Sequence, residues 1–378
     1  MKIAYISSHP APYRDSFLGG LVRVRKFHTD VFSLFSSDCG HDFWKLAAPP
    51  YENIVISDKN DGSISLKVFL RLMKLIFKGR YEYICWPGFI PSCLIACMLL
   101  QILFRKKYVI VADTIAQRRI GKISFLVKKF LLQRAAFLFV PGQKSLEFFS
   151  TTFGINPSKI CYGAYSLDGK GLEEKILLYR EQKVAMRKYY GISDDDKVFL
   201  MVANMIKTRN YPITSKAFIK ATKDRNDVKF ILVGRGPDLP YMQVMAAKEP
   251  SLIVLPGVSF EEMLKLYAIA DVYVHGGAEP ASTALVIGAI AHLPLISSPA
   301  VGCFADVVRD GETGYAVDDF LSDDQWENAF RRALAGQDDW ERMGARARVL
   351  SEELDSDRVV EVFSEKISSV LEGRNHVE

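Results

Sequence analysis

The stretch DVYVHGGAEPASTALVIGAIAHLPLISSPAVGCFADVVRDGETGY, residues 271–315, decides the fold prediction. It opens with an apolar run over residues 271–276, which is typical of a buried parallel strand. Residues 276–281 then turn the chain into an apolar helix that is expected to begin near Ser282. The start of a helix offers unpaired N–H groups and the positive end of the helix dipole. An anion such as a diphosphate can therefore bind at this turn.

Polar side chains lie around the same turn. Ser282 or Thr283 can add a hydroxyl donor to an anion site, and Glu279 is placed to accept hydrogen bonds from a polyol. The same pattern is compatible with an ordinary strand, turn and helix that carry a surface glutamate. The segment therefore predicts an αβ unit with a candidate anion and polyol site.

Length and composition limit the class of protein. A chain of 378 residues with 49% hydrophobic and 25% charged residues is expected to form two globular domains. Its six cysteines form no CxxC pair, which disfavours a zinc site or a disulfide framework and fits a reducing cytosol. No signal peptide is expected, and the longest apolar run, residues 90–104, is shorter than the ~20 residues of a spanning helix. A cytoplasmic protein is predicted.

The charge is distributed unevenly. Residues 1–163 contain 23 Lys and Arg against 10 Asp and Glu, a net charge of +13, and the totals of 49 and 44 leave −8 for the remainder. The helical pattern over residues 67–80 sets apolar side chains against four cations, so it can rest on anionic lipid headgroups or be an ordinary domain helix. Nucleic acid is not an expected partner, because the cations are scattered and no nucleic-acid motif is present.

Strand and helix patterns alternate along the whole chain. Apolar runs near residues 2–8, 107–113 and 197–205 are among the expected strands, with helical patterns between successive runs. This alternation predicts α/β domains with doubly wound parallel sheets. A polar stretch that begins at Ser166 marks the expected hinge, so that the domains cover residues 1–165 and 166–356.

The run from Glu279 to Pro294, EPASTALVIGAIAHLP, resembles the signature of the family 4 glycosyltransferases, which have the GT-B fold. In that family a Glu opens the motif, small residues and a short helix follow, and a Pro begins the next strand. Glu279 and Pro294 keep this spacing. The family's second Glu, which holds the nucleotide ribose, falls on Ile287, which cannot bind a hydroxyl. How the ribose is held is therefore an open question.

A second family motif follows the expected strand at 197–205. The run ANMIKTRN, residues 203–210, resembles G-R-L-x-x-x-K, in which the Arg and the Lys bind the donor diphosphate. Arg209 takes the place of the Lys and keeps its charge, whereas Asn204 takes that of the Arg and does not. Lys207 can supply the missing charge. A cation here would stabilise a leaving diphosphate.

Two more segments resemble parts of the family's donor site. Gly234 opens GRGP, which is similar to the G-x-G-P loop beside the nucleobase. Val258 opens VSFEE, which is similar to a segment whose backbone contacts the edge of the base. Residues Pro280, Ala281, Ser282 and Thr283 complete the donor-binding set that the resemblance implies.

The first half contributes two candidates. His9 follows the first strand in HPAPYR, and the resemblance implies contact with the acceptor or the donor sugar, although an ordinary turn histidine fits as well. Asp113 ends the expected strand at 107–113, where the family has a residue that faces the transferred sugar. The resemblance also implies that the last helix, residues 357–373, packs back onto the first domain.

Taken together, the resemblance implies a GT-B fold: two Rossmann-like doubly wound domains that face across a cleft. The implied activity is retaining transfer of a hexosyl group from a nucleotide sugar to a saccharide or lipid-linked saccharide, in surface polysaccharide or glycan biosynthesis. No cofactor and no metal ion are expected. Glu279, Arg209, Asp113 and His9 are the expected catalytic residues, and peripheral contact with the inner face of the plasma membrane is expected.

A different class of function fits the departures from the motifs. Asn204 and Ile287 are compatible with a catalytically degenerate binding or scaffold protein that keeps the fold and has lost transfer. An enzyme similar to glycogen phosphorylase would need a Schiff-base lysine and a much longer chain.

Overall fold

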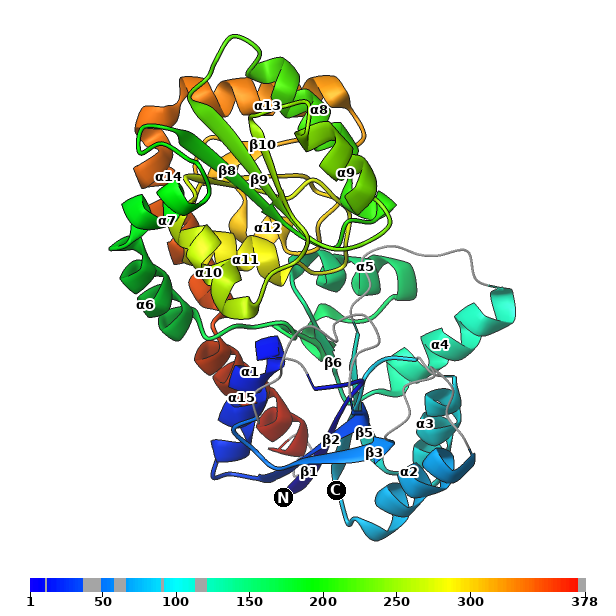
Figure 1. Ribbon diagram of the computed structural model, residues 1–378. Coiled ribbons are helices and arrows are strands. Elements are labelled where there is room, and N and C mark those ends of the chain that lie inside the picture. The colour runs from blue at the N-terminus through cyan, green and yellow to red at the C-terminus, as the bar shows by residue number, and fades with distance from the viewer. Residues whose placement is uncertain (11, 37–48, 58–65, 90–91, 113–120, 373–378) are drawn as a thin grey trace. The chain divides into compact units, whose positions relative to one another are not determined.

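The computed structural model describes residues 1–10, 12–36, 49–57, 66–89, 92–112 and 121–372. The chain forms two compact units (Figure 1). The first contains Met1–Asp168 and Leu354–Glu378, and the second contains Gly169–Glu353. The boundaries expected from the sequence, after residues 165 and 356, fall close to the two points where the chain passes from one unit to the other.

The first unit is built on a parallel sheet with the strand order β3-β2-β1-β4-β5-β6-β7. The strands are β1 (Lys2–Ser7), β2 (His28–Phe35), β3 (Asn53–Ser57), β4 (Tyr83–Trp86), β5 (Lys107–Val111), β6 (Leu138–Val140) and β7 (Ile160–Tyr162). Side chains alternate between the two faces: Ile3 and Tyr5 pack into one core, and Ala4 and Ile6 into the other.

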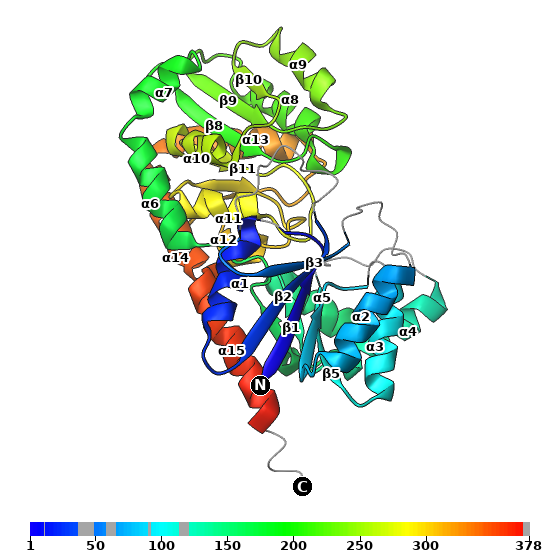
Figure 2. The same cartoon turned by 60° about the horizontal axis from the view of Figure 1, so that its bottom comes forward.

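Helices cover both faces of this sheet. They are α1 (Pro12–Arg23), α2 (Leu66–Lys78), α3 (Cys93–Leu103), α4 (Lys122–Arg134), α5 (Gln143–Phe153) and α15 (Ser356–Glu372). Helices α1 and α15 lie side by side on one face, where Phe17 packs against Phe363, and α2, α3 and α4 lie on the other (Figure 2). The last helix thus belongs to the core of the first unit.

The second unit has a parallel sheet with the order β10-β9-β8-β11-β12-β13. Its strands are β8 (Lys197–Val202), β9 (Val228–Val233), β10 (Leu252–Leu255), β11 (Val272–Val274), β12 (Leu295–Ser297) and β13 (Gly314–Ala316). Its helices are α6 (Gly169–Arg180), α7 (Lys183–Tyr189), α8 (Tyr211–Ala221), α9 (Leu239–Ala246), α10 (Phe260–Ile269), α11 (Thr283–Ile290), α12 (Phe304–Val307), α13 (Asp323–Ala335) and α14 (Trp340–Ser351). Both parallel sheets confirm the predicted fold class.

The charged, helix-like sequence over residues 175–191 is divided between two helices in the structure. Helix α6 begins earlier, at Gly169, and the chain bends before α7 begins at Lys183. The bend brings the buried Arg187 side chain to the backbone oxygens of Ile269 and Asp196 and to the Asp271 carboxylate at 2.7 Å. Buried carbonyls need donors, and this guanidinium supplies them.

Within the described ranges, no helix is both long enough and apolar enough to cross a membrane.

Candidate active site

The order of the strands reverses between β8 and β11. The chain adds β9 and β10 on one side of β8, and then β12 and β13 on the far side of β11. Loops that leave the carboxyl ends of two such neighbouring strands run to opposite faces of the sheet and leave a crevice between them, where ligands bind in open α/β folds. The loops here are residues 203–210 and 275–282, which are the two segments with the strongest chemical signals in the sequence.

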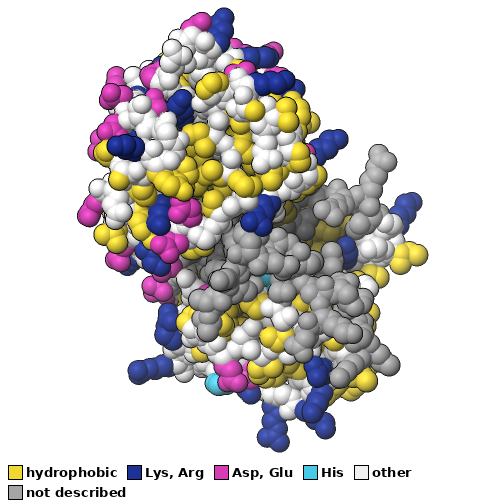
Figure 3. Space-filling model, in the orientation of Figure 1, with side chains coloured by type: hydrophobic (Ala, Val, Ile, Leu, Met, Phe, Trp, Pro, Cys, Tyr) yellow, Lys and Arg dark blue, Asp and Glu magenta, His cyan; other side chains and the backbone are white. Residues whose placement is uncertain are grey.

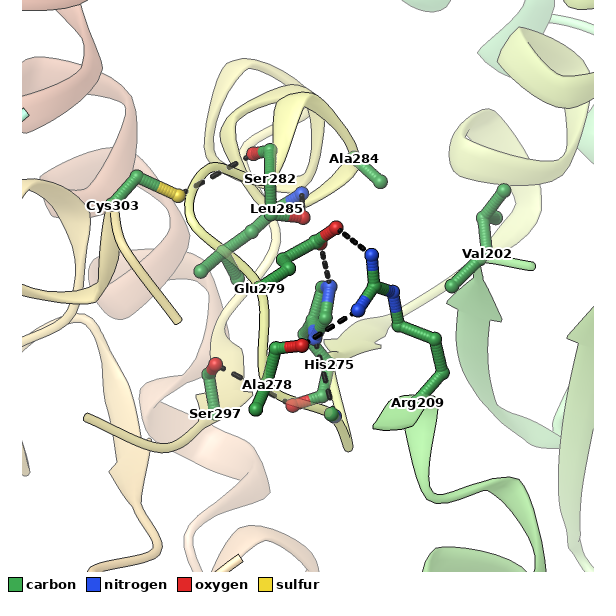
Figure 4. Close-up of polar contacts among 12 residues, drawn as sticks. Val202, Arg209, His275, Ala278, Glu279, Ser282, Ala284, Leu285, Ser297 and Cys303 are labelled. Atoms are coloured by element: carbon green, nitrogen blue, oxygen red, sulfur yellow. Dashed lines mark hydrogen bonds and ion pairs between the residues drawn. The ribbon is translucent and has the colours of Figure 1, made fainter. Parts of the chain in front are cut away.

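Arg209 and His275 meet at the Glu279 carboxylate (Figure 4). The guanidinium Nη2 of Arg209 lies 2.6 Å from Glu279 Oε2, and His275 Nε2 contacts Oε1. Arg209 also donates through Nη1 to the backbone oxygen of Ala278 at 2.6 Å. Arg209, which belongs to the loop after β8, therefore holds the loop after β11 in place.

The ring of His275 has a defined orientation. Its Nδ1 accepts a hydrogen bond from the backbone N–H of Gly277 at 3.3 Å, so the proton that is donated to Glu279 resides on Nε2. The ring is 1% exposed. Because the hydrogen bond from the Gly277 N–H fixes the ring, His275 holds the Glu279 carboxylate in one position.

Burial alone would raise the pKa of Glu279, but interactions with His275 and Arg209 outweigh it and lower the pKa below its ordinary value of 4.5. A carboxylate with such partners is ionised at neutral pH. It is thus an acceptor for hydroxyl groups, and the adjoining guanidinium is a donor for an anion.

Glycine allows the two loops to come this close. A Cβ atom on Gly277 would lie 2.4 Å from Arg209 Cα and 2.5 Å from the backbone oxygen of Thr208. The backbone N–H of Ala278 donates to that same oxygen at 2.8 Å. The turn after β11 therefore depends on a residue without a side chain at position 277.

Helix α11 begins directly beside this cluster, as predicted, with Ser282 as its N-cap. The Ser282 hydroxyl accepts the backbone N–H of Leu285 at 3.2 Å, and Cys303 Sγ donates to the backbone oxygen of Ser282 at 3.4 Å. Ser282 is buried, whereas Thr283 is half-buried. The structure thus uses Ser282 to cap the helix, which leaves Thr283 as the more accessible of the two hydroxyls.

The loop after β8 is fixed by Tyr211. Its hydroxyl accepts the N–H of Ala203 at 2.8 Å and lies 2.7 Å from the backbone oxygen of Val233, so it ties the ends of β8 and β9 together. Asn204 and Lys207 are exposed on this loop, and Arg209 is half-buried. The short 3₁₀ turn Lys207–Arg209 directs the arginine toward β11.

The loop after β9 packs under the loop after β8. A Cβ on Gly234 would lie 2.0 Å from the Ala203 oxygen, and Met205 donates its N–H to the Arg235 oxygen at 2.7 Å. Val258 is half-buried just before α10, which Ser259 caps through the Glu262 N–H at 3.1 Å. Gly234 is therefore placed beside the candidate site by direct backbone contact.

Residues 182–350 match the family model described as Glycosyl transferases group 1. This part of the chain is thus similar to the glycosyl transferases group 1 family. The match confirms the family that the Glu279 motif had predicted, and it spans both loops of the candidate site.

Similar proteins agree with this assignment. The chain is 28% identical to alpha-monoglucosyldiacylglycerol synthase of Acholeplasma laidlawii over 141 residues. The aligned stretch is 35% of this chain and 34% of that protein. It is 24% identical over 220 residues to N-acetyl-alpha-D-glucosaminyl L-malate synthase of Bacillus anthracis, 57% of this chain and 56% of that protein. The matches thus span about a third to just over half of these relatives' lengths.

The whole chain has structural counterparts. The crystal structure of Anabaena HepE in complex with UDP covers 98% of this chain and 100% of that chain, with a TM-score of 0.75 and 16% sequence identity. At this identity the likeness concerns the fold. The architecture is the GT-B fold, with one Rossmann-like α/β domain in each unit.

Ile287 occupies the place of the second Glu of the group 1 motif and is 3% exposed in the apolar helix α11. The next residue, Gly288, packs against the Tyr273 ring, where a Cβ would come within 2.8 Å. Helix α11 is packed in the interior at these positions, and the Ile287 side chain has no acceptor atom for a ribose hydroxyl.

His9 lies in the first unit and follows β1 at its carboxyl end, and its predicted contact with a sugar stays a prediction. His9 Nδ1 lies 3.0 Å from the Ser8 hydroxyl, and Arg14 donates to the His9 backbone oxygen at 3.3 Å. Asp113 lies outside the described residues, so its predicted role stays a prediction. Among the described residues, no group of three or more His, Cys, Asp and Glu side chains could hold a metal ion.

The sequence alone does not single out His275, which stands at the end of a predicted buried strand. The available signal was its position: a histidine at the carboxyl end of a parallel strand, four residues before the motif glutamate. Because a lone histidine is so often a packing residue, only the fold shows that its ring faces Glu279.

Proposed function

We propose that the protein is a retaining glycosyltransferase that moves a hexosyl group from a nucleotide-diphosphate sugar to a saccharide or lipid-linked saccharide. One observation carries the proposal. In a domain of the glycosyl transferases group 1 family, Arg209 and Glu279 meet at the switch point of the sheet. A cation for a diphosphate and a carboxylate for sugar hydroxyls are thus held side by side.

In this proposal the donor diphosphate lies against Arg209 and the first turn of α11. The guanidinium and the N-terminal amides supply positive charge where the leaving diphosphate becomes more negative. Lys207, exposed on the same loop, adds a second cation. The helix dipole and Arg209 are already in place, so little reorganisation is needed in the transition state.

In the same proposal, Glu279 binds the donor sugar. Its ionised carboxylate accepts hydrogen bonds from hydroxyl groups, and His275 and Arg209 fix its position. The catalytic contribution is then orientation of the sugar together with stabilisation of the leaving group. Retention of configuration and transfer without a metal ion are included in the proposal because of the family resemblance.

The acceptor is proposed from charge. The basic first half favours an acceptor at an anionic surface, such as a lipid-linked saccharide at the inner face of the plasma membrane. One similar protein is named as a synthase of a glucosyldiacylglycerol and another as a synthase of a glucosaminyl malate, so relatives act on lipids and on small soluble compounds. A role in surface polysaccharide or glycan assembly fits the lipid-linked case.

A second candidate function is a degenerate protein that binds a nucleotide sugar without transferring it. Two observations favour it. Ile287 is buried where the family has an acceptor for the ribose, and Asn204 stands where the family has an arginine. Tight binding of a nucleotide sugar, with neither hydrolysis nor transfer to any acceptor tested, would establish this function.

The test is calorimetric titration of UDP, GDP, ADP, TDP and CMP against the wild type and Arg209→Ala. Lys223→Ala, which removes an exposed cation from the same unit, is the matched control. We expect one nucleoside diphosphate to bind, Arg209→Ala to weaken it about a hundredfold, and Lys223→Ala to leave it unchanged. Equal binding by Arg209→Ala would contradict the proposed diphosphate site.

A further inference from the structure

Helix α3 has no charged residue: its sequence is CLIACMLLQIL. Its inner side packs into the core through Leu94, Cys97 and Met98. Its outer side is exposed and is still apolar, with Leu99 42% and Leu103 72% exposed. A helix that is apolar all round belongs either in a protein interior or in lipid. This one lies on the surface of the first unit.

Helix α4 lies next to α3 and repeats the pattern. Ile123, Leu126 and Phe130 follow the spacing i, i+3 and i+7, so they share one stripe of the helix. They are 80%, 62% and 41% exposed, whereas Leu131 and Leu132 are buried on the other side. The helix therefore has two apolar sides, and only one of them packs on the sheet.

Helix α2 completes this surface. Phe77, 41% exposed, packs edge-on against Phe104 just after α3, with ring centroids 4.8 Å apart. Among the exposed large hydrophobic side chains described in the first unit, all but Val22 and Ile54 lie on α2, on α4 or between Leu99 and Phe104. We call the outward side of α2, α3 and α4 the helical face.

The helical face is bordered by cations. Arg71, Lys74 and Lys78 are exposed on α2, Arg105 follows α3, and Lys122 begins α4. From residue 92 to residue 146 the sequence contains one acidic residue, Asp113. In Figure 3 the side chains over α4 are hydrophobic or basic, whereas acidic side chains gather over the second unit. The exposed apolar side chains of the helical face are thus bordered by positively charged side chains.

We propose that the helical face docks on an anionic lipid bilayer. The aliphatic stripes enter the boundary between headgroups and acyl chains, while the lysines and arginines bind the anionic headgroups. The inference deepens the proposed function and rests on it only in that the bilayer would carry a lipid-linked acceptor.

Other occupants fit the helical face less well. A second copy of the chain would bring this basic surface against itself, because a twofold interface pairs like with like. Nucleic acid would satisfy the cations but would leave Ile123, Leu126 and Leu103 against phosphates and water. A bilayer with anionic headgroups satisfies the charges and buries the aliphatic side chains together.

The test is co-sedimentation of the full chain with vesicles of phosphatidylcholine alone and of phosphatidylcholine mixed with phosphatidylglycerol. We expect about tenfold stronger binding to the mixed vesicles, decreasing with added salt. The double substitution Ile123→Ser with Leu126→Ser should lower that binding about tenfold, and Lys122→Glu should lower it as well. The matched control is Val244→Ser with Leu321→Ser, two exposed positions in the second unit, which should bind like the wild type.

Three results would overturn the inference: no binding to either vesicle, equal binding to both, or unchanged binding by the double variant. Self-association that the double variant abolishes would assign the helical face to a second copy instead. Thermal unfolding and nucleoside diphosphate titration of every variant separate the two proposals. Lost vesicle binding with intact nucleotide binding concerns this inference alone, and intact vesicle binding without nucleotide binding concerns the proposed function alone.

Discussion

Arg209 and Glu279 form an ion pair, with 2.6 Å between Nη2 and Oε2, and they are proposed to hold two adjacent parts of the donor, the diphosphate and the sugar. The ion pair joins the loop after β8 to the loop after β11 across the switch point. A guanidinium has five N–H donors, so it can keep its bond to Glu279 and donate to a phosphate oxygen at the same time. In the proposed function, the pair therefore sets the spacing between the diphosphate site and the sugar site before the donor arrives.

Glu279→Gln should impair transfer far more than folding. The amide keeps the size of the side chain but removes the charge that Arg209 and His275 orient. We expect turnover to fall about a hundredfold and the melting temperature to fall only modestly, because the charged contacts to Arg209 and His275 are weakened. The measurement is the rate of sugar transfer beside a thermal scan, with Glu312→Gln, an exposed position, as the control. Wild-type turnover in the variant would remove Glu279 from the mechanism.

Stability should depend on pH through Glu279. Its pKa is lower in the folded protein than its ordinary value of 4.5, because His275 and Arg209 outweigh the effect of burial. A lowered pKa means that the carboxylate stabilises the fold fully above that ordinary value, and that this contribution is lost as the pH falls through the folded value.

We therefore expect the free energy of unfolding to decrease from about pH 5 toward pH 3, and to decrease less in Glu279→Gln. Urea unfolding at several pH values measures this. Some pH dependence will remain in the variant, since the pKa of Glu173 is also lowered: burial opposes the shift, but Arg348 and His292 prevail. Identical slopes for the wild type and the variant would contradict the role of Glu279.

The sequence predicts most strands of the two sheets because they lie in apolar runs of several residues. It predicts the start of α11 at Ser282 because a capping serine stands directly before an apolar helix. It does not predict the strand β13, because the sequence around it, GETGYAVDD over residues 311–319, is rich in glycine and polar residues and contains no long apolar run.

The contacts within the site are less predictable. Arg209 and Glu279 could be named from motifs, but their ion pair could not, because it depends on how two loops far apart in sequence approach each other. His275 illustrates the same limit. Its role follows from the direction of its ring at the end of β11, and side-chain direction at a strand end is set by tertiary packing.

Gly277→Ala should separate the two loops. Its Cβ would lie 2.4 Å from Arg209 Cα and 2.5 Å from the Thr208 oxygen, and both of these atoms belong to backbone that cannot shift at low cost. We expect a loss of about 1–3 kcal/mol in the free energy of unfolding and about tenfold weaker nucleoside diphosphate binding. Urea unfolding and calorimetry measure these. Gly121→Ala, whose Cβ would meet nothing within 4 Å, should change neither, and unaltered binding in Gly277→Ala would disprove the constraint.

Ile287→Ala should lower stability without weakening the binding of a nucleoside diphosphate. The side chain is 3% exposed in α11, so its truncation leaves a cavity that costs about 2–5 kcal/mol. Leu321→Ala, at a position 60% exposed, should cost less than about 0.5 kcal/mol. Urea unfolding and calorimetric titration of both variants provide the comparison. The expected result means that position 287 serves packing and that the ribose is held by other groups. Weaker nucleotide binding with undiminished stability would instead place Ile287 against the nucleoside, and the departure from the motif would then be a change of specificity.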